Sequence, residues 1–254
     1  MLHLLRKKAF LKNTKILILL IFFAVGFKTT AQAQYMNYSR VELNQPDHDD
    51  KPYYFGITIG VNLARFQTSM HSRFLQYDSV LVAEPVNSGG FTLGLSATGR
   101  ISNRFQMRFN PQLMFIERGI FYRLKYPDIM TGDSAVNKKV ESVIVSLPFQ
   151  LKFQSDRIGN FRVYTLAGFK FDIDMASNAR ARKAEELVKI TKYDFGPEFG
   201  IGFNFFFDSF IFSPEIKISN GIRNIHSRDP NLKYSNVFDK INSRMIIFSI
   251  HLEG

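Results

Sequence analysis

Cysteine and tryptophan are both absent from the 254 residues of this chain. Without cysteine there can be no disulfide, no thiolate metal site and no cysteine nucleophile. Beyond residue 33 the chain also lacks any charge-free apolar run close to the roughly 20 residues that a membrane-spanning helix needs. These absences exclude a disulfide-stapled scaffold and a bundle of membrane helices.

Acidic residues are absent from the first 33 positions, whereas the whole chain has a net charge of +11. The basic residues of this segment are Arg6, Lys7, Lys8, Lys12, Lys15 and Lys28. An apolar stretch from Ile16 to Phe27 follows, and Ala31 and Ala33 occupy the small-residue positions before a cleavage point. We predict a signal peptide over 1–33, so that the mature protein starts at Gln34 outside the cytoplasm. An uncleaved membrane anchor is the alternative.

Removal of residues 1–33 leaves 27 basic residues against 22 acidic ones, a net charge of +5. Most of the case for a nucleic-acid partner disappears with that segment, and we expect no such partner. Residues 34–51 are polar and show neither a helical nor a strand period. We expect them to form a flexible periplasmic lead-in to a single domain over 52–254.

Apolar and polar residues alternate with a period of two through most of residues 52–254. In the first run, one face carries Phe55, Ile57, Ile59, Val61 and Leu63. The eight runs are "YYFGITIGVNLA", "GFTLGLSATGRI", "RFQMRFNPQLMF", "ESVIVSLPFQLKFQ", "FRVYTLAGFKFDI", "YDFGPEFGIGFNFFF", "FIFSPEIKIS" and "SRMIIFSIHLEG". Each has the length that a tilted strand needs to cross hydrocarbon, and an even number of strands allows antiparallel closure without an edge.

The connections between these runs alternate in length. After the second, fourth and sixth runs they are short ("SNR", "SDRIGN" and "DS"), and the other connections are longer. This pattern is typical of outer-membrane barrels with short periplasmic turns and long external loops. We therefore predict an all-β, eight-stranded antiparallel transmembrane up-and-down β-barrel in the cell outer membrane, with both termini in the periplasm.

A secreted lipocalin-like barrel has the same alternation with its apolar face inward. The length of the runs, their rows of phenylalanine and the many glycines on their polar faces favour the membrane barrel instead. Prolines at positions 111, 148, 197 and 214 fall inside four runs, where each removes a ladder hydrogen bond. We expect bulges or strand ends at these positions.

The polar faces carry charges of both signs, which must be paired if they are buried. We predict a structural charge network in the lumen, and the alternative is a proton or ion path. Its members are Arg100, Arg108, Lys152, Arg162, Lys170, Asp172, Asp194, Glu198, Glu215 and Lys217. Phe206 breaks the alternation by pointing inward near a short turn, where it would plug the barrel floor.

Few residues are candidates for catalysis or metal binding. His48, His71, His226 and His251 have no metal-ligand spacing, and the Ser–His neighbours in the loops lack a nucleophile elbow. We predict no catalytic, cofactor-binding or metal-binding residues, no cofactor, no small-molecule substrate and no enzymatic activity. Arg180, Arg182 and Lys183, in the loop segment "NARARKAEELVKI", form either a solvated face or a surface that contacts a partner.

Several blocks of the mature chain resemble the PorT (SprT) family of outer-membrane β-barrel proteins of the Bacteroidetes. The most specific are "RFNPQLMF" through "ERGIFY", "SLPFQLKF" and "GPEFGIG". The resemblance spans about Lys51 to Leu252. It implies a non-enzymatic part in the type IX secretion system, contact with other secretion-system proteins and with membrane lipid, and support of gliding motility.

One departure from the usual pattern is the C-terminus, which reads "HLEG" where many outer-membrane barrels end on an aromatic residue. Two other functions remain open. The first is a stand-alone adhesin or envelope-integrity barrel of the OmpA and OmpX type, and the second is an outer-membrane hydrolase that uses the loop histidines.

Overall fold

The computed structural model describes residues 42–72, 74, 80–127, 132–176, 190–227, 234 and 236–254. These residues form one compact unit, Glu42–Gly254. The predicted signal peptide and Arg180, Arg182 and Lys183 lie outside the described residues. No helix in the described part of the chain is long and apolar enough to cross a membrane.

One sheet of ten strand segments makes up the fold, preceded by a short 3-10 helix, η1 (Pro46–Asp50). The segments are β1 (Tyr53–Met70), β2 (Val80–Val86), β3 (Ser88–Arg100), β4 (Phe105–Phe109), β5 (Gln112–Leu124), β6 (Ala135–Gln154), β7 (Phe161–Asp174), β8 (Tyr193–Phe206), β9 (Ile211–Asn220) and β10 (Phe238–Glu253).

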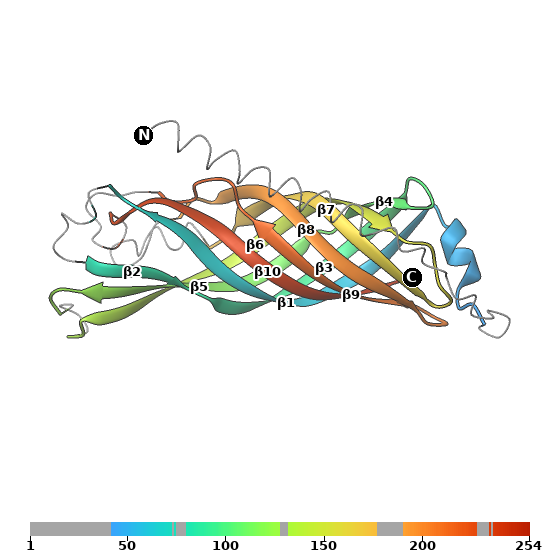
Figure 1. Ribbon diagram of the computed structural model, residues 1–254, viewed down its shortest axis with the longest axis horizontal. Coiled ribbons are helices and arrows are strands. Elements are labelled where there is room, and N and C mark those ends of the chain that lie inside the picture. Colours follow the sequence, from blue (N-terminus) through green and yellow to red (C-terminus); the bar gives the residue numbers. More distant parts are fainter. Residues whose placement is uncertain are drawn as a thin grey trace, which may run out of the picture. The chain divides into compact units, whose positions relative to one another are not determined.

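The ten segments form a closed ring of eight strands. Only one residue separates β2 from β3, and only two separate β4 from β5, so each of these pairs acts as one interrupted strand. Both β4 and β5 pair with β3 on one side and with β6 on the other. The ring closes because β1 pairs antiparallel with both β3 and β10 (Figure 1). The predicted eight-stranded antiparallel barrel is confirmed.

Two of the four strand prolines, Pro111 and Pro148, lie at one interruption of the ladders. Pro111 separates β4 from β5, and its carbonyl accepts a hydrogen bond from the Leu95 amide at 3.0 Å. Pro148 stands on β6 opposite that break, and its carbonyl accepts from the Asn110 amide at 3.3 Å. Because proline has no amide donor, two prolines at one interruption leave fewer ladder donors unpaired than two separate breaks would. The expectation of bulges or strand ends is wrong for Pro197 and Pro214, which stand inside β8 and β9 and pair with Phe169 and Ile250 without a register shift.

An apolar belt covers the outer face of the barrel. On β1 the side chains of Phe55 and Leu63 are 63% and 59% exposed, whereas those of Tyr54, Thr58 and Asn62 point inward and are buried. The same alternation runs through the strands that the sequence pattern identified.

Beyond Leu63 this alternation inverts within the same strand. Arg65 and Gln67 are exposed on the outer face of β1, while Ala64 and Phe66 are buried inside. On β6 the residues before Val143 show the same inversion, with exposed Lys139 outside. The strands therefore continue past the apolar belt.

This continuation makes β1 18 residues long and β6 20 residues long, which exceeds the predicted strand length, and the loops are correspondingly shorter. The sequence pattern did not predict this extension, because strands were expected only where the outer face is apolar.

Buried apolar side chains fill the loop end of the barrel. They come from strands and from two loops, and comprise Phe66, Val80, Ala83, Ile120, Tyr122, Leu124, Val136, Val140, Ile190, Ile225, Tyr234, Val237, Phe238 and Ile241. A second apolar layer follows, made of Ala64, Met114, Ile116, Ile144, Met245 and Ile247. The extended part of the barrel thus has a core like that of a soluble protein.

The turn end is covered by η1, drawn in blue at the end opposite β2 (Figure 1). Here the expectation of a flexible lead-in up to residue 51 is wrong for residues 44–50. His48 is buried, and the Asn44 side chain donates a hydrogen bond to the Phe206 carbonyl at 3.0 Å. These residues are ordered because Asp49 meets a group of arginines at the barrel floor.

Candidate functional site: the charged barrel interior

A buried ionic cluster occupies the middle of the barrel. Arg108 on β4 donates a hydrogen bond to the carboxylate of Glu215 on β9 at 2.8 Å, and both side chains are fully buried. The Tyr164 hydroxyl on β7 donates to the same carboxylate oxygen at 2.8 Å. The Lys152 ammonium on β6 lies 3.9 Å from the centre of the Tyr164 ring. Four strands therefore place their charges and one phenol at the same level of the lumen.

Glu253 and His251 on β10 complete this central cluster. The Glu253 carboxylate lies 3.6 Å from the Arg108 guanidinium and 3.8 Å from the Lys152 ammonium. His251 Nε2 lies 3.5 Å from the Glu215 carboxylate. The sequence analysis missed Glu253, although this residue follows the inward-facing Ser249 and His251 at intervals of two. Tyr164 was also missed, although it lies an even number of residues from Arg162 and Lys170 and therefore shares their face of β7.

A second pair lies on the neighbouring strands. The Lys217 ammonium on β9 is 3.6 Å from the Glu198 carboxylate on β8. The Gln150 side chain on β6 donates a hydrogen bond to the same carboxylate at 2.9 Å. Glu198 therefore has both a charge partner and an amide donor, as a buried carboxylate requires.

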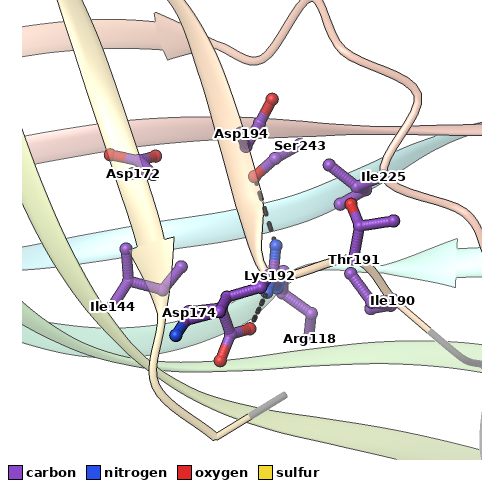
Figure 2. A pocket seen from close by; sticks show the side chains of 10 residues that line it. All are labelled: Arg118, Ile144, Asp172, Asp174, Ile190, Thr191, Lys192, Asp194, Ile225 and Ser243. Atoms are coloured by element: carbon purple, nitrogen blue, oxygen red, sulfur yellow. Dashed lines mark hydrogen bonds and ion pairs between the residues drawn. The ribbon is translucent and has the colours of Figure 1, made fainter. Parts of the chain in front are cut away.

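A third cluster lies nearer the loop end, around a small cavity (Figure 2). Lys170 donates to Asp172 on the same face of β7, and Arg118 on β5 lies 3.7 Å from the Asp174 carboxylate. Arg118 also donates to the Ser142 hydroxyl at 2.7 Å.

Asp194 on β8 lines the same cavity (Figure 2). One of its carboxylate oxygens accepts from the Phe195 amide at 2.8 Å, and the other has no hydrogen-bond partner among the described residues. The cavity volume is about 10 Å³, which is space for about one water molecule. It is too small for an organic substrate.

The turn-end cluster centres on Asp49 of η1. Arg162 donates two hydrogen bonds to its carboxylate, at 2.8 and 3.0 Å, and Arg100 and Arg157 lie 3.7 and 4.0 Å away. Burial alone would raise the pKa of Asp49, but the hydrogen bonds from Arg162 and the three arginine charges lower this pKa below its ordinary value. Burial, aided by the charge of Lys51, lowers the pKa of His48 to about 4.

Phe206 lies under this segment. The Arg157 guanidinium stacks 3.7 Å from the centre of its ring, and the His48 ring lies 5.9 Å away. Phe206 is buried, at 3% exposure, so the residue that broke the sequence alternation forms part of the barrel floor.

The ten residues predicted for one lumen network therefore fall into four groups. Arg108, Lys152 and Glu215 meet in the central cluster, Glu198 and Lys217 form a pair, and Lys170, Asp172 and Asp194 lie near the cavity. Arg100 and Arg162 pair with Asp49 of the N-terminal segment and not with a strand carboxylate. This contact could not be read from the strand pattern, because Asp49 precedes the first strand.

Within the described residues, no group of three or more His, Cys, Asp or Glu side chains has an arrangement that could hold a metal ion. Of the loop histidines, His226 is buried against the ring of Phe238 at 6.5 Å. The described interior is filled by paired charges in the middle and by apolar side chains toward the loop end.

The sequence matches the family model of the outer membrane protein beta-barrel domain over residues 31–227. The chain belongs to this family. Its members are typically non-enzymatic structural or adhesin proteins, and the membership places the chain in the outer membrane. No curated protein matches the sequence.

Solved structures with a similar fold include several outer-membrane proteins. Neisserial surface protein A is 10% identical, with a TM-score of 0.39, and the match covers 78% of this chain and 96% of that one. OprG from Pseudomonas aeruginosa is 14% identical, with a TM-score of 0.40, and covers 78% and 94%. Ail of Yersinia pestis, in complex with the heparin analogue sucrose octasulfate, is 11% identical, with a TM-score of 0.34, and covers 80% and 100%.

Proposed function

We propose that this protein is a non-enzymatic component of the type IX protein secretion system. In this role it supports the export or assembly of secreted and surface proteins, and also gliding motility. The resemblance to the PorT family supports this role, and its most specific blocks share a structural feature. "RFNPQLMF" contains the Pro111 interruption, and "SLPFQLKF" contains Pro148, which faces that interruption across the ladder.

The observation that carries a non-conducting role is the filled interior. Apolar side chains close the loop end, the central cluster around Arg108 and Glu215 occupies the middle, and η1 covers the floor. An eight-stranded barrel has an interior only just wide enough for side chains. A protein substrate would have no path through such a barrel, so the protein acts through its outer surfaces.

We infer that its partners are other secretion-system proteins and outer-membrane lipid. In the proposed orientation the short turns and both termini face the periplasm, and the loop end faces outward. The floor around η1 is then available to periplasmic partners. The loop that contains Arg180, Arg182 and Lys183 is the candidate contact surface on the other side.

The alternative function is a stand-alone adhesin or envelope-integrity barrel. It is favoured by the walls of β1, β5, β6 and β10, which continue beyond the apolar belt with a polar outer face. Such a projecting surface suits contact with external macromolecules. It serves equally well as a docking face within a secretion complex.

Deletion of the gene separates these two functions. We expect the deletion strain to lose bulk secretion of proteins that carry C-terminal targeting domains, while its envelope keeps normal resistance to detergents and large antibiotics. Complementation with the wild-type gene should restore secretion. Normal secretion combined with lost adhesion or a leaky envelope would reject the secretion role and support the alternative.

Purification of the native complex in mild detergent gives an independent test. An affinity tag after Gly254 should recover other outer-membrane and periplasmic secretion proteins in stable ratios. An equally abundant barrel of unrelated function, tagged in the same way, controls for proteins that bind any barrel. Recovery of the tagged protein alone would argue against a place in a secretion complex.

A further inference from the structure

Four exposed basic side chains gather where the apolar belt ends on β1 and β10. They are Arg65 on β1, Lys240 and Arg244 on β10, and Arg223 in the segment that follows β9. Arg65 and Arg244 are directly opposite each other in the β1–β10 ladder. Side chains in such positions have Cβ atoms about 4.5–5.5 Å apart, and two like charges there destabilise the strand pair.

Arg223 is fixed beside this pair. The Asn242 side chain on β10 donates hydrogen bonds to the backbone carbonyls of Gly221 and Arg223, at 3.1 and 2.9 Å. Asn242 stands two residues from both Arg244 and Lys240, so all four cations belong to one surface. We call Arg65, Arg223, Lys240 and Arg244 the β1/β10 basic patch.

The described residues provide the patch with no counterion in an ion pair. Within the described part of the chain, none of its four cations forms an ion pair, and the carboxylate adjacent in sequence is that of the exposed Asp239. Among the described residues, one acid against four bases leaves a surplus of positive charge on this sector.

The corresponding boundary on β5 and β6 is balanced differently. There the Lys139 ammonium lies 3.0 Å from the Glu117 carboxylate, and Glu141 stands opposite Glu117 in the ladder. Two acids against one base leave no surplus of positive charge among these three side chains. Of these two boundaries, only the β1/β10 sector has a surplus of positive charge.

The patch lies at the edge of the apolar belt. On the same outward faces, Arg65 and Arg244 come directly after Leu63 and Ile246, which are 59% and 39% exposed and are themselves paired in the ladder. The two arginines thus stand at the level where hydrocarbon gives way to lipid head groups. Phosphate is an anion of that level, and an arginine fork binds it with two parallel hydrogen bonds.

We propose that the β1/β10 basic patch binds the phosphate groups of a glycolipid in the outer leaflet. One phosphate bridges Arg65 and Arg244, which relieves their mutual repulsion, and Arg223 and Lys240 extend the contact toward the sugar. The choice of leaflet rests on the proposed orientation of the barrel, whereas the binding itself is tested in micelles, where orientation plays no part.

The test measures lipid retention by the full-length protein in zwitterionic micelles, using native mass spectrometry with diphosphorylated lipid A as the probe. We expect wild-type protein to bind this lipid at least tenfold more tightly than the same lipid without phosphates. We expect the double variant Arg65→Gln/Arg244→Gln to lose about tenfold in affinity for the phosphorylated lipid. The matched variant Lys139→Gln, which removes an exposed cation at the other boundary, should bind as wild type does.

Two further measurements test whether the binding is electrostatic and whether it is specific for the lipid. Raising the salt from 50 to 500 mM should weaken binding to the wild-type protein, because exposed charges are screened, and this arm does not depend on the folding of a variant. Equal affinity for the two lipids, or equal weakening by Lys139→Gln, would overturn the proposal. Inorganic phosphate or heparin that displaces the lipid at stoichiometric concentration would assign the patch to a soluble anion and would also overturn it.

Discussion

The Arg108 guanidinium and the Glu215 carboxylate form a 2.8 Å hydrogen-bonded ion pair from which solvent is excluded, although β4 and β9 are not neighbours in the barrel. The pair crosses the lumen and joins opposite walls. Its energetic importance follows from burial, because an ion that loses its closest partner in this position has no water to replace that partner.

Removal of one partner of this pair should strongly destabilise the barrel. For Glu215→Gln we expect a loss of about 3–5 kcal/mol in the free energy of unfolding, since Arg108 would stay buried with only the more distant Glu253. The measurement is reversible urea unfolding in lipid vesicles.

The matched control for Glu215→Gln is Asp156→Asn, which breaks the exposed pair between Asp156 and Arg104 and should cost less than about 1 kcal/mol. Similar losses for both variants would show that the interior is hydrated and that the charges there are screened.

The docking of η1 should depend on pH in two separate ranges. Burial lowers the pKa of His48 from 6.5 to about 4, so the unfolded segment binds a proton that the docked one excludes, and docking weakens as the pH falls through this interval. The pKa of Asp49 is also lowered, so its contribution is present above the ordinary carboxyl range and is lost as the pH falls further.

Hydrogen exchange of the backbone amides of residues 47–51, two of which donate hydrogen bonds within the segment, measures this docking. Asp49→Asn should weaken docking at neutral pH and abolish the dependence at low pH, because the contacts with Arg162 lose their charge. His48→Gln should remove only the dependence between about pH 4 and 6.5. A docked segment whose protection is constant from pH 7 to pH 3 would contradict both assignments.

Close backbone approach makes one glycine indispensable and leaves another replaceable. A Cβ atom at Gly196 on β8 would overlap the carbonyl oxygen of Asn220, which is main chain and cannot rotate away. We expect Gly196→Ala to prevent assembly of the folded barrel, as measured by the gel shift between unheated and heated samples. Gly99→Ala on β3 meets no atom within 4 Å and should fold as wild type does.

The barrel should be electrically closed. In planar lipid bilayers we expect no stepwise conductance from the wild-type protein. A variant that lacks residues 42–50 should also stay silent, because the apolar cluster around Phe66, Tyr122 and Phe238 still fills the loop end. Steady conductance steps from the wild-type protein would show that these layers open.

The fold could be predicted from the sequence because the alternation of apolar and polar residues, which identifies a strand, involves only residues close together in the chain. Alternation of residues such as Phe55 and Ile57 against glycine and threonine identified the strands in the belt, and the short connections gave the antiparallel order. The extension of β1 past Leu63 could not be predicted in this way. At Arg65 and Phe66 the outer face becomes polar and the inner face apolar, and this reversal resembles the end of a strand.

The interior could be predicted only in part, for a different reason. Every second residue along a strand points inward, so the inward-facing residues can be listed from the sequence. The same rule, extended to the end of β10, also identifies Glu253. This rule does not say which inward residues lie at the same level. The pairing of Asp49 with Arg162 depends on contact between segments 113 residues apart, for which the chain carries no local signal.

The inverted alternation sets how deeply the barrel sits in its bilayer. A shift that carried the loop end inward would bring Arg65 and Arg244 into hydrocarbon, where a basic side chain costs about 2–4 kcal/mol at the midplane. A shift in the other direction would bring Leu63 and Ile246 into water. The strand sequence therefore fixes the depth of the barrel in the bilayer. It also fixes how far the projecting wall stands above the membrane surface, where a partner would bind.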